Sequence, residues 1–310
     1  PCQSTAECYT VPNHEQHLRD YGWACERTGP LGLATVVDRI HYTGNLIDPN
    51  SLALALVMAA ALLLGLATWP QRPIRKWLWL LGLPLFAFAV VLAASRAAQV
   101  AMGAVLLCFF YFRVGILGAG LAGVLASPVM LISTRNDAEA AYSTVTRIMT
   151  YLNGFRAFLD YPFFGVGYAN YERISFLNAH NSFLQALVET GVLGGTLYLT
   201  GIYVSVKLLF QVIRWPQSGL DDDAQLQLAE LQHLAKTLLA MLLGVLLCVL
   251  FLSLAFDFSW LLPLGLIAAF EMHLREKLPG FRLSVGFIEL AILMTSTLLL
   301  LGLFILASAR

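Results

Sequence analysis

About eight apolar segments, most of them near 20 residues long, dominate the chain and leave few alternatives to a membrane fold. Of the 310 residues, 58% are hydrophobic and 12% are charged, which is about half the charged share of a soluble domain. The sequence therefore predicts an all-α polytopic membrane protein with about eight transmembrane helices. We place the spans near residues 51–69, 76–94, 97–113, 114–133, 182–210, 236–256, 258–273 and 283–307. The formal net charge is zero, so composition gives no electrostatic case for nucleic acid.

The charges that flank the spans predict which side of the membrane each link faces. The link 71–76 is short and basic, which is typical of a cytoplasmic link. Alternation from there makes the links 211–235 and 275–282 cytoplasmic as well. Every lysine then falls at a cytoplasmic end: Lys76, Lys207, Lys236 and Lys277. The outer side holds residues 1–50, the loop 134–181 and the short link at Ser95-Arg96.

The first 50 residues are polar and rich in glycine and proline, so we expect an extramembrane loop there. The sequence opens on Pro1 without an initiator methionine or a signal peptide, and we expect further membrane helices upstream of it. Cys2, Cys8 and Cys25 lie in this segment. Two of them can pair in an oxidising compartment, and the connectivity stays open.

The outer loop 134–181 is long, and long loops with structure of their own are often functional. Apolar residues recur at helical spacing from Ser143 to Leu159, which predicts an amphipathic helix near the interface. Arg147, Tyr151 and Gly154 share one face of that helix.

The loop leads into the next span at the segment 178–191. Ser182 and Gln185 have the spacing of a capping box, so we expect the helix to start at Ser182 and His180 to lie just outside it. Glu189 then lies about 10 Å inside the helix. A carboxylate at that depth is costly unless it is paired or faces water, so we expect an internal polar cavity with His180, Arg96 or Arg147 as neighbours.

These residue types fit one reaction. A histidine near neutral pKa can take a proton from a sugar hydroxyl. Arginine forks match phosphate oxygens and can hold a diphosphate leaving group without a metal, and every basic residue on the predicted outer side is arginine. No Cys/His spacing predicts a metal site, and the acidic triplet 221–223 is more typical of a helix start than of a cation site.

The order of motifs resembles the O-antigen ligase and polymerase family. The matching elements are the turn 161–167 (YPFFGVG), the His180-Asn181 pair that opens a membrane helix, and the Glu-x-Gly element of 189–191. Arg147 matches an arginine on the loop helix before the turn. Ser95-Arg96-Ala97 resembles an element at an outer helix end, and Arg39, Gly44 and the segment 48–50 (DPN) resemble an upstream element. The resemblance spans roughly residues 39–200.

This resemblance implies a GT-C-like helical bundle in the bacterial inner membrane, with its active site facing the periplasm. It implies an undecaprenyl-diphosphate-linked glycan as donor, a lipid A-core sugar or another lipid-linked glycan as acceptor, and no metal or other cofactor. By position, His180 would be the base or the acceptor-orienting residue, with Asn181 beside it and Glu189 supporting the site. Arg96 and Arg147 would bind the diphosphate, and Arg39 would assist. The loops 1–50 and 134–181 would then be periplasmic, and 134–181 would be the catalytic loop.

Two other functions fit parts of the pattern. A transporter or flippase for a lipid-linked or anionic solute would also use arginines and a membrane-embedded glutamate, although the paired halves usual in transporters are not seen. A protein O-oligosaccharyltransferase would share the fold and motif. Within the family, a ligase and an O-antigen or exopolysaccharide polymerase remain open.

Overall fold

The computed structural model describes residues 27–28, 34–36, 39–40, 49–69, 76–93, 95–131, 137–175, 177–217, 219, 221–278 and 280–308. The cysteines considered for a disulfide, Cys2, Cys8 and Cys25, lie outside these residues, as does Gly44. Within the first 50 residues, three short strands form an antiparallel sheet in the order β1-β2-β3. They are β1 (Arg27–Thr28), β2 (Ala34–Val36) and β3 (Arg39–Ile40). The sequence predicted only a loop in this region, because strands this short leave no alternating pattern to detect.

In the described part of the chain, long helices occupy the positions of the predicted spans. They are α3 (Pro49–Ala67), α4 (Lys76–Leu92), α5 (Arg96–Val114), α6 (Ile116–Leu131), α9 (Ser182–Ile213), α10 (Asp222–Val249), α11 (Phe258–Lys277) and α12 (Phe287–Ser308). Four of them, α3, α5, α9 and α10, are long and apolar enough to cross a membrane, judged on the described residues. The all-α membrane architecture is therefore confirmed, and the total of about eight spans stays a prediction.

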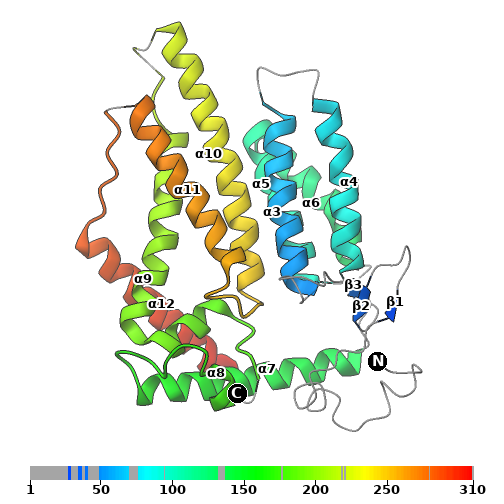
Figure 1. Cartoon of the computed structure of the whole chain (residues 1–310), viewed down its shortest axis with the longest axis vertical. Helices are drawn as coiled ribbons and strands as arrows, with labels where there is room; N and C mark the ends of the chain where they lie inside the picture. The colour runs from blue at the N-terminus through cyan, green and yellow to red at the C-terminus, as the bar shows by residue number, and fades with distance from the viewer. Residues whose placement is uncertain are drawn as a thin grey trace.

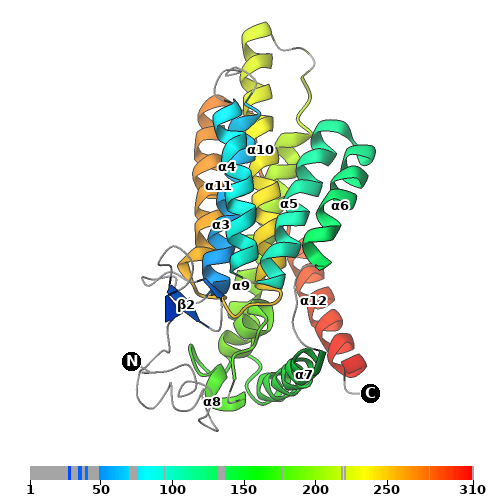
Figure 2. The same cartoon turned by 90° about the vertical axis from the view of Figure 1, so that its right-hand side faces the viewer.

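The bundle consists of two groups of helices joined through α10 (Figure 1). Helices α3 to α6 form one group and α9 to α12 the other, and α10 packs against both α3 and α5. The side chains at this junction are fully buried, including Leu54, Val57, Leu239 and Val245. Figure 2 shows α5 and α6 running side by side at one edge of the bundle.

The predicted division of residues 76–133 into three helices is confirmed. The first break lies around Ser95, which precedes α5 in extended conformation. The second lies at Gly115, whose φ of 79° ends α5 and lets α6 turn back beside it. A positive φ of this kind suits glycine, which has no Cβ to clash.

Most of the predicted link 211–235 is helical, because α10 already begins at Asp222, and the cytoplasmic location of this segment stays a prediction. Asp221 is its N-cap, and its Oδ1 accepts a hydrogen bond from the backbone N–H of Ala224 at 2.9 Å. The capping role expected for the acidic triplet is thus confirmed. The hydropathy pattern predicted no span here because only one narrow face is buried, formed by Leu228, Leu231, Gln232 and Ala235, while the other face is mostly polar.

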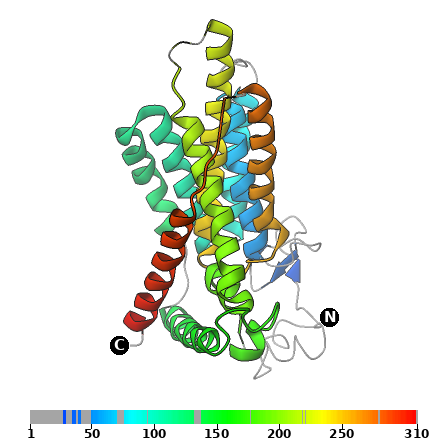
Figure 3. The ribbon, with the colours of Figure 1, turned by 90° about the vertical axis from the view of Figure 1, so that its left-hand side faces the viewer.

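Helix α7 (Asp137–Asp160) lies across one end of the bundle (Figure 1). The predicted amphipathic helix is confirmed, and it starts six residues earlier than Ser143. A short helix, α8 (Tyr171–Ser175), follows it. Figure 3 shows α12 descending beside α9 to reach α7 at this end. We call this end of the bundle the α7 end.

Candidate active site

The turn that follows α7 is inserted into a break in α9. At Gly191 the backbone of α9 leaves helical geometry, with φ 64° and ψ −166°. An unbroken helix would bond the N–H groups of residues 192 and 193 to the carbonyls of residues 188 and 189. The break frees all four groups, and the turn satisfies each of them.

Four backbone hydrogen bonds join the two segments. The N–H groups of Val166 and Gly167 donate to the carbonyls of Val188 and Glu189, each at 3.0 Å. In return, the carbonyl of Pro162 accepts from residue 192 at 2.8 Å, and that of residue 163 accepts from residue 193 at 3.4 Å. The membrane helix and the loop therefore share one hydrogen-bond network at the break.

Two glycines make this close approach possible. A Cβ on Gly165 would lie 2.5 Å from backbone atoms of Val188, Glu189 and Gly191. A Cβ on Gly191 would in turn overlap the carbonyl group of Phe163. Both glycines also have positive φ, which side chains disfavour. The glycine turn and the Glu-x-Gly element of the sequence are thus two halves of one backbone contact.

Glu189 fastens the far side of the same turn. Its side chain is 1% exposed. One carboxylate oxygen accepts from the N–H of Ala169 at 3.1 Å, and the other accepts from the N–H of Tyr171 at 3.2 Å. The sequence predicted a polar cavity around this carboxylate with His180, Arg96 or Arg147 as neighbours, but its hydrogen bonds come from the backbone of Ala169 and Tyr171 and from the side chain of Gln185.

Asn181, and not Ser182, caps α9. Its Oδ1 accepts from the N–H of Leu184 at 2.9 Å, and its backbone is extended. The predicted capping box is wrong because both of its members are used elsewhere. Ser182 is fully buried, donates to the carbonyl of Leu252 at 2.7 Å and accepts from the N–H of residue 254 at 2.9 Å. Gln185 accepts from the N–H of residue 255 at 3.3 Å.

His180 lies just outside α9, as the sequence predicted, and its backbone is held from two sides. Its N–H donates to Oγ of Ser253 at 2.6 Å. Its carbonyl accepts from the hydroxyl of Tyr151 on α7 at 3.4 Å. Its φ is 47°, a left-handed conformation that is uncommon outside glycine and that clusters at functional sites. The side chain is half-buried.

Arg147 lies one helical turn before Tyr151 on α7 and is close to it. Burial raises the pKa of the Tyr151 phenol, and the positive charge of Arg147 opposes that rise. The Nε atom of Arg147 is buried and has no hydrogen-bond partner among the described residues. A buried guanidinium N–H without an acceptor is rare in folded proteins, and it leaves a donor for an anion.

Tyr171 forms a buried contact between α8 and α7 beneath the site. Tyr171 is 1% exposed, and its hydroxyl donates to the carbonyl of Thr150 on α7 at 2.9 Å. Burial raises its pKa, so the phenol keeps its proton at neutral pH and can donate. The ring lies against Gly154, where a Cβ would overlap it. The predicted helix face of Arg147, Tyr151 and Gly154 is therefore the face that α7 turns toward this site.

The structure brings Arg147, His180, Asn181 and Glu189 into one unit made of α7, the turn and the start of α9. Arg96 is the first residue of α5, at the α7 end of the bundle, with an exposed side chain. Arg39 lies in β3, where its backbone pairs with Val36. Sequence reasoning missed the segment 252–255 that supports the start of α9, because its contacts join residues about 70 positions apart.

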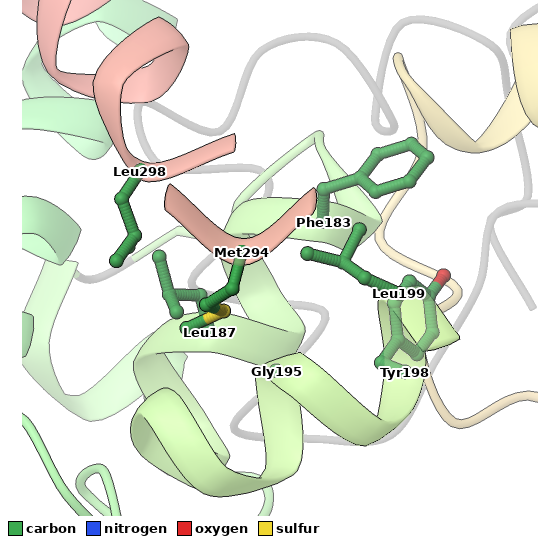
Figure 4. A pocket seen from close by; sticks show the side chains of 7 residues that line it. All are labelled: Phe183, Leu187, Gly195, Tyr198, Leu199, Met294 and Leu298. Carbon is green, nitrogen blue, oxygen red and sulfur yellow. The ribbon is translucent and has the colours of Figure 1, made fainter. Parts of the chain in front are cut away.

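On both sides of the break, α9 packs against α12. Met294 and Leu298 of α12 lie over Leu187 and Gly195 of α9, around a small apolar pocket (Figure 4). Farther along, Nζ of Lys207 lies 2.6 Å from a carboxylate oxygen of Glu289. These contacts fix the outer flank of the helix that carries the site.

A family model described as O-antigen ligase matches residues 50–199. Residues 50–199 belong to the O-antigen ligase family. This O-antigen ligase segment contains every predicted site residue except Arg39, and it ends beyond the break in α9. The resemblance predicted from the motifs is thereby confirmed over this range. No curated protein and no solved structure matches the chain.

The family and the apolar helices together define the broad class of this protein. The match and the helices point to a multi-pass bacterial membrane protein of lipopolysaccharide biosynthesis, and the family matched over residues 50–199 is one of glycosyltransferases of the O-antigen ligase or polymerase type. The substrates of that family are in general a lipid-linked glycan and an acceptor. Among the described residues, no group of three or more His, Cys, Asp or Glu is placed to hold a metal ion.

Proposed function

We propose that this protein transfers a glycan from an undecaprenyl-diphosphate donor to an acceptor hydroxyl at the α7 end of the bundle. The observation that carries the proposal is the linked pair of Arg147 and His180. The guanidinium of Arg147 lies beside Tyr151 with a buried Nε that has no hydrogen-bond partner among the described residues, and the Tyr151 hydroxyl donates to the backbone carbonyl of His180. A cation for a diphosphate and a base for a hydroxyl are thus held together at one end of a membrane bundle.

In the proposed reaction, the acceptor hydroxyl oxygen attacks the anomeric carbon of the donor sugar. The bond from that carbon to the diphosphate oxygen breaks, and the diphosphate leaves with the electron pair. His180 takes the proton of the acceptor hydroxyl as a general base. Arg147 donates to the phosphate oxygens and stabilises the charge that develops on them, with Arg96 and Arg39 assisting at the same diphosphate.

Asn181 and Glu189 position the reacting groups in this proposal. Asn181 caps α9 and so fixes the residue next to His180. Glu189 fixes the turn through two backbone hydrogen bonds. Transfer in this scheme uses neither a metal nor a nucleotide sugar, because the arginines supply the positive charge. Activity should therefore persist in a chelator, and inhibition that added divalent metal reverses would contradict the scheme.

We further propose that the α7 end faces the periplasm and that the membrane is the bacterial inner membrane. The distribution of lysine supports this orientation. Lys277 ends α11 and Lys207 lies late in α9, both toward the end of the bundle opposite α7. Positive charge in short links marks the cytoplasmic side.

The direct test is the His180→Ala variant of the purified full-length protein in lipid vesicles, assayed with an undecaprenyl-diphosphate-linked glycan. We expect transfer to fall by a factor of about 100 or more, the usual contribution of a general base, with an unchanged melting temperature. His273→Ala is the matched control, since His273 is exposed on α11, and it should transfer normally. Normal transfer by His180→Ala would refute the proposed base.

A second test addresses the diphosphate. Arg147→Lys keeps the charge but loses the planar fork of donors, so we expect transfer to fall by about 10-fold or more with little change in stability. The control is Arg156→Lys, because Arg156 is exposed on the same helix. Equal activity of Arg147→Lys and the unmodified protein would argue against a two-pronged phosphate contact.

The surface glycan of a strain lacking the gene separates ligase from polymerase. Loss of a polymerase leaves caps of a single repeat unit on the lipid A-core. Loss of a ligase leaves lipid-linked polymer that is not attached to the core. A normal surface glycan, with transport of a lipid-linked solute abolished, would instead support a flippase.

A further inference from the structure

A polar cavity lies at the end of the bundle opposite α7. It forms where α3 and α5 end against the middle of α10, and its volume is about 410 Å³. Its lining includes Phe109, Phe112 and Arg113 of α5, together with His233 and Lys236 of α10. This size falls within the range of small-ligand pockets in proteins.

Two cations in the cavity have no counter-charge within the described part of the chain. Arg113 lies in the last turn of α5 with an exposed side chain. Lys236 is half-buried, and its Nζ lies 5.9 Å from the centroid of the Phe112 ring. Among the residues that the structure describes, neither cation forms an ion pair, and no carboxylate lines the cavity. Such a cavity favours an anionic ligand.

The other polar groups of the cavity are already used. The hydroxyl of Thr68 donates to the carbonyl of Leu64 at 2.7 Å, and that of Thr237 donates to the carbonyl of His233 at 3.0 Å. Nε2 of His233 lies 2.9 Å from the carbonyl oxygen of Gly65. A carbonyl oxygen can only accept, so this nitrogen donates. Among the described residues that line the cavity, the two cations are therefore the donors left for a ligand.

The level of the cavity along the bundle indicates where that ligand comes from. α3 ends at Ala67 and α5 ends at Val114, while the first turns of α10 continue past them (Figure 1). The cavity thus lies where the apolar spans end. Trp69 packs edge-on against His233, with ring centroids 5.4 Å apart, and tryptophan is enriched at the membrane–water interface.

We propose that this cavity binds the phosphate of an anionic phospholipid head group from the leaflet opposite the α7 end. Arg113 and Lys236 would donate to the phosphate oxygens, and Phe109 and Phe112 would contact the glycerol and the upper acyl chain. Basic pockets between transmembrane helices bind phospholipid head groups in this manner. The site uses none of the residues proposed for glycan transfer, so either proposal can fail without the other.

The test is retention of phosphatidylglycerol by the purified full-length protein, measured by native mass spectrometry after exchange into phosphatidylcholine containing a minor share of phosphatidylglycerol. We expect Arg113→Gln and Lys236→Gln each to weaken retention by about fivefold, and the double variant by about 25-fold. The control is the pair Arg214→Gln and Lys277→Gln, which removes two exposed cations at the same end, outside the cavity. The control should retain the lipid as the unmodified protein does.

Two outcomes would overturn the proposal. The first is equal retention by the double variant and the control. The second is a rise in melting temperature with inorganic phosphate in detergent as large as that with phosphatidylglycerol, which would assign the cavity to a soluble anion. Should Lys236→Gln melt lower than the unmodified protein in phosphatidylcholine alone, Arg113→Gln carries the test, because that side chain is exposed.

Discussion

At Glu189, a carboxylate inside a membrane helix is satisfied by the backbone of a loop. Both oxygens accept N–H groups, one from Ala169 and one from Tyr171. Hydrogen bonds to a charged group contribute more than neutral ones, and a buried group left without a partner is costly. Because these two donors are backbone N–H groups, this contact depends on the path of the loop backbone and not on which side chains the loop carries.

Glu189→Gln should therefore act on stability first. The amide keeps one acceptor oxygen and turns an NH₂ group toward a backbone N–H, so we expect a loss of about 1–3 kcal/mol in the free energy of unfolding. Thermal unfolding in vesicles measures this, alongside transfer activity per folded molecule. Glu172→Gln is the control, because Glu172 is exposed on α8. Lost activity with an unchanged melting temperature would instead mean that Glu189 takes part in the chemistry.

His180 and its neighbours show what a local pattern can and cannot predict. The position of His180 just before α9 was predictable, because a cluster of polar residues gives way to an apolar run there. The identity of the N-cap residue was not predictable, because asparagine and serine, found here as Asn181 and Ser182, are both good N-caps. What decides between them is the segment 252–254, which occupies the hydroxyl of Ser182. Only the fold brings that segment near.

At the scale of elements, α9 is two helical pieces held together by the turn in its break. The four backbone bonds at the break depend on two glycines that approach each other closely. The sequence shows the glycine turn 161–167 and the Glu-x-Gly element 189–191 as two separate motifs. Their contact is not readable, because glycine signals a permissive backbone and not the identity of its partner.

Gly191→Ala should separate the turn from the helix. The new methyl group would overlap the carbonyl of Phe163, and the residue would keep an unfavourable positive φ. We expect a loss of about 2–4 kcal/mol, seen as a lower melting temperature and faster proteolysis within 161–170. Gly201→Ala on the same helix is the control, since its Cβ would meet nothing closer than Leu264 at 4.0 Å. Equal proteolysis of the two variants would contradict the interlocked turn.

At the scale of the whole molecule, hydropathy located most helices to within a few residues. Long apolar runs leave few alternatives, so α3 to α6 and α11 lie close to their predicted ranges. The failures come where burial is partial. The first turns of α10 bury one narrow face and were predicted as a link, and the short strands of residues 27–40 carry no period at all.

The proposed orientation makes a prediction for intact cells. In a cysteine-free background, Tyr168→Cys at the α7 end should react with a membrane-impermeant maleimide applied outside the inner membrane. Gln217→Cys, between α9 and α10, should react only after the membrane is opened. Both positions are exposed, so access to the reagent and not burial decides the result. The reverse pattern would place the proposed site in the cytoplasm.

The turn within α9 also has a consequence for how the chain is made. Residues 162–167 are synthesised before residues 188–193, so the loop has already left the ribosome when the second half of α9 is made. Until the loop packs into the break, α9 has two backbone carbonyls and two N–H groups without hydrogen-bond partners, about 14 Å from its start. Each such group costs several kcal/mol in lipid. We therefore expect α9 to be stable in the membrane only after the turn 161–167 has bound to the break. An insertion between the two motifs should be tolerated far better than a change in either one.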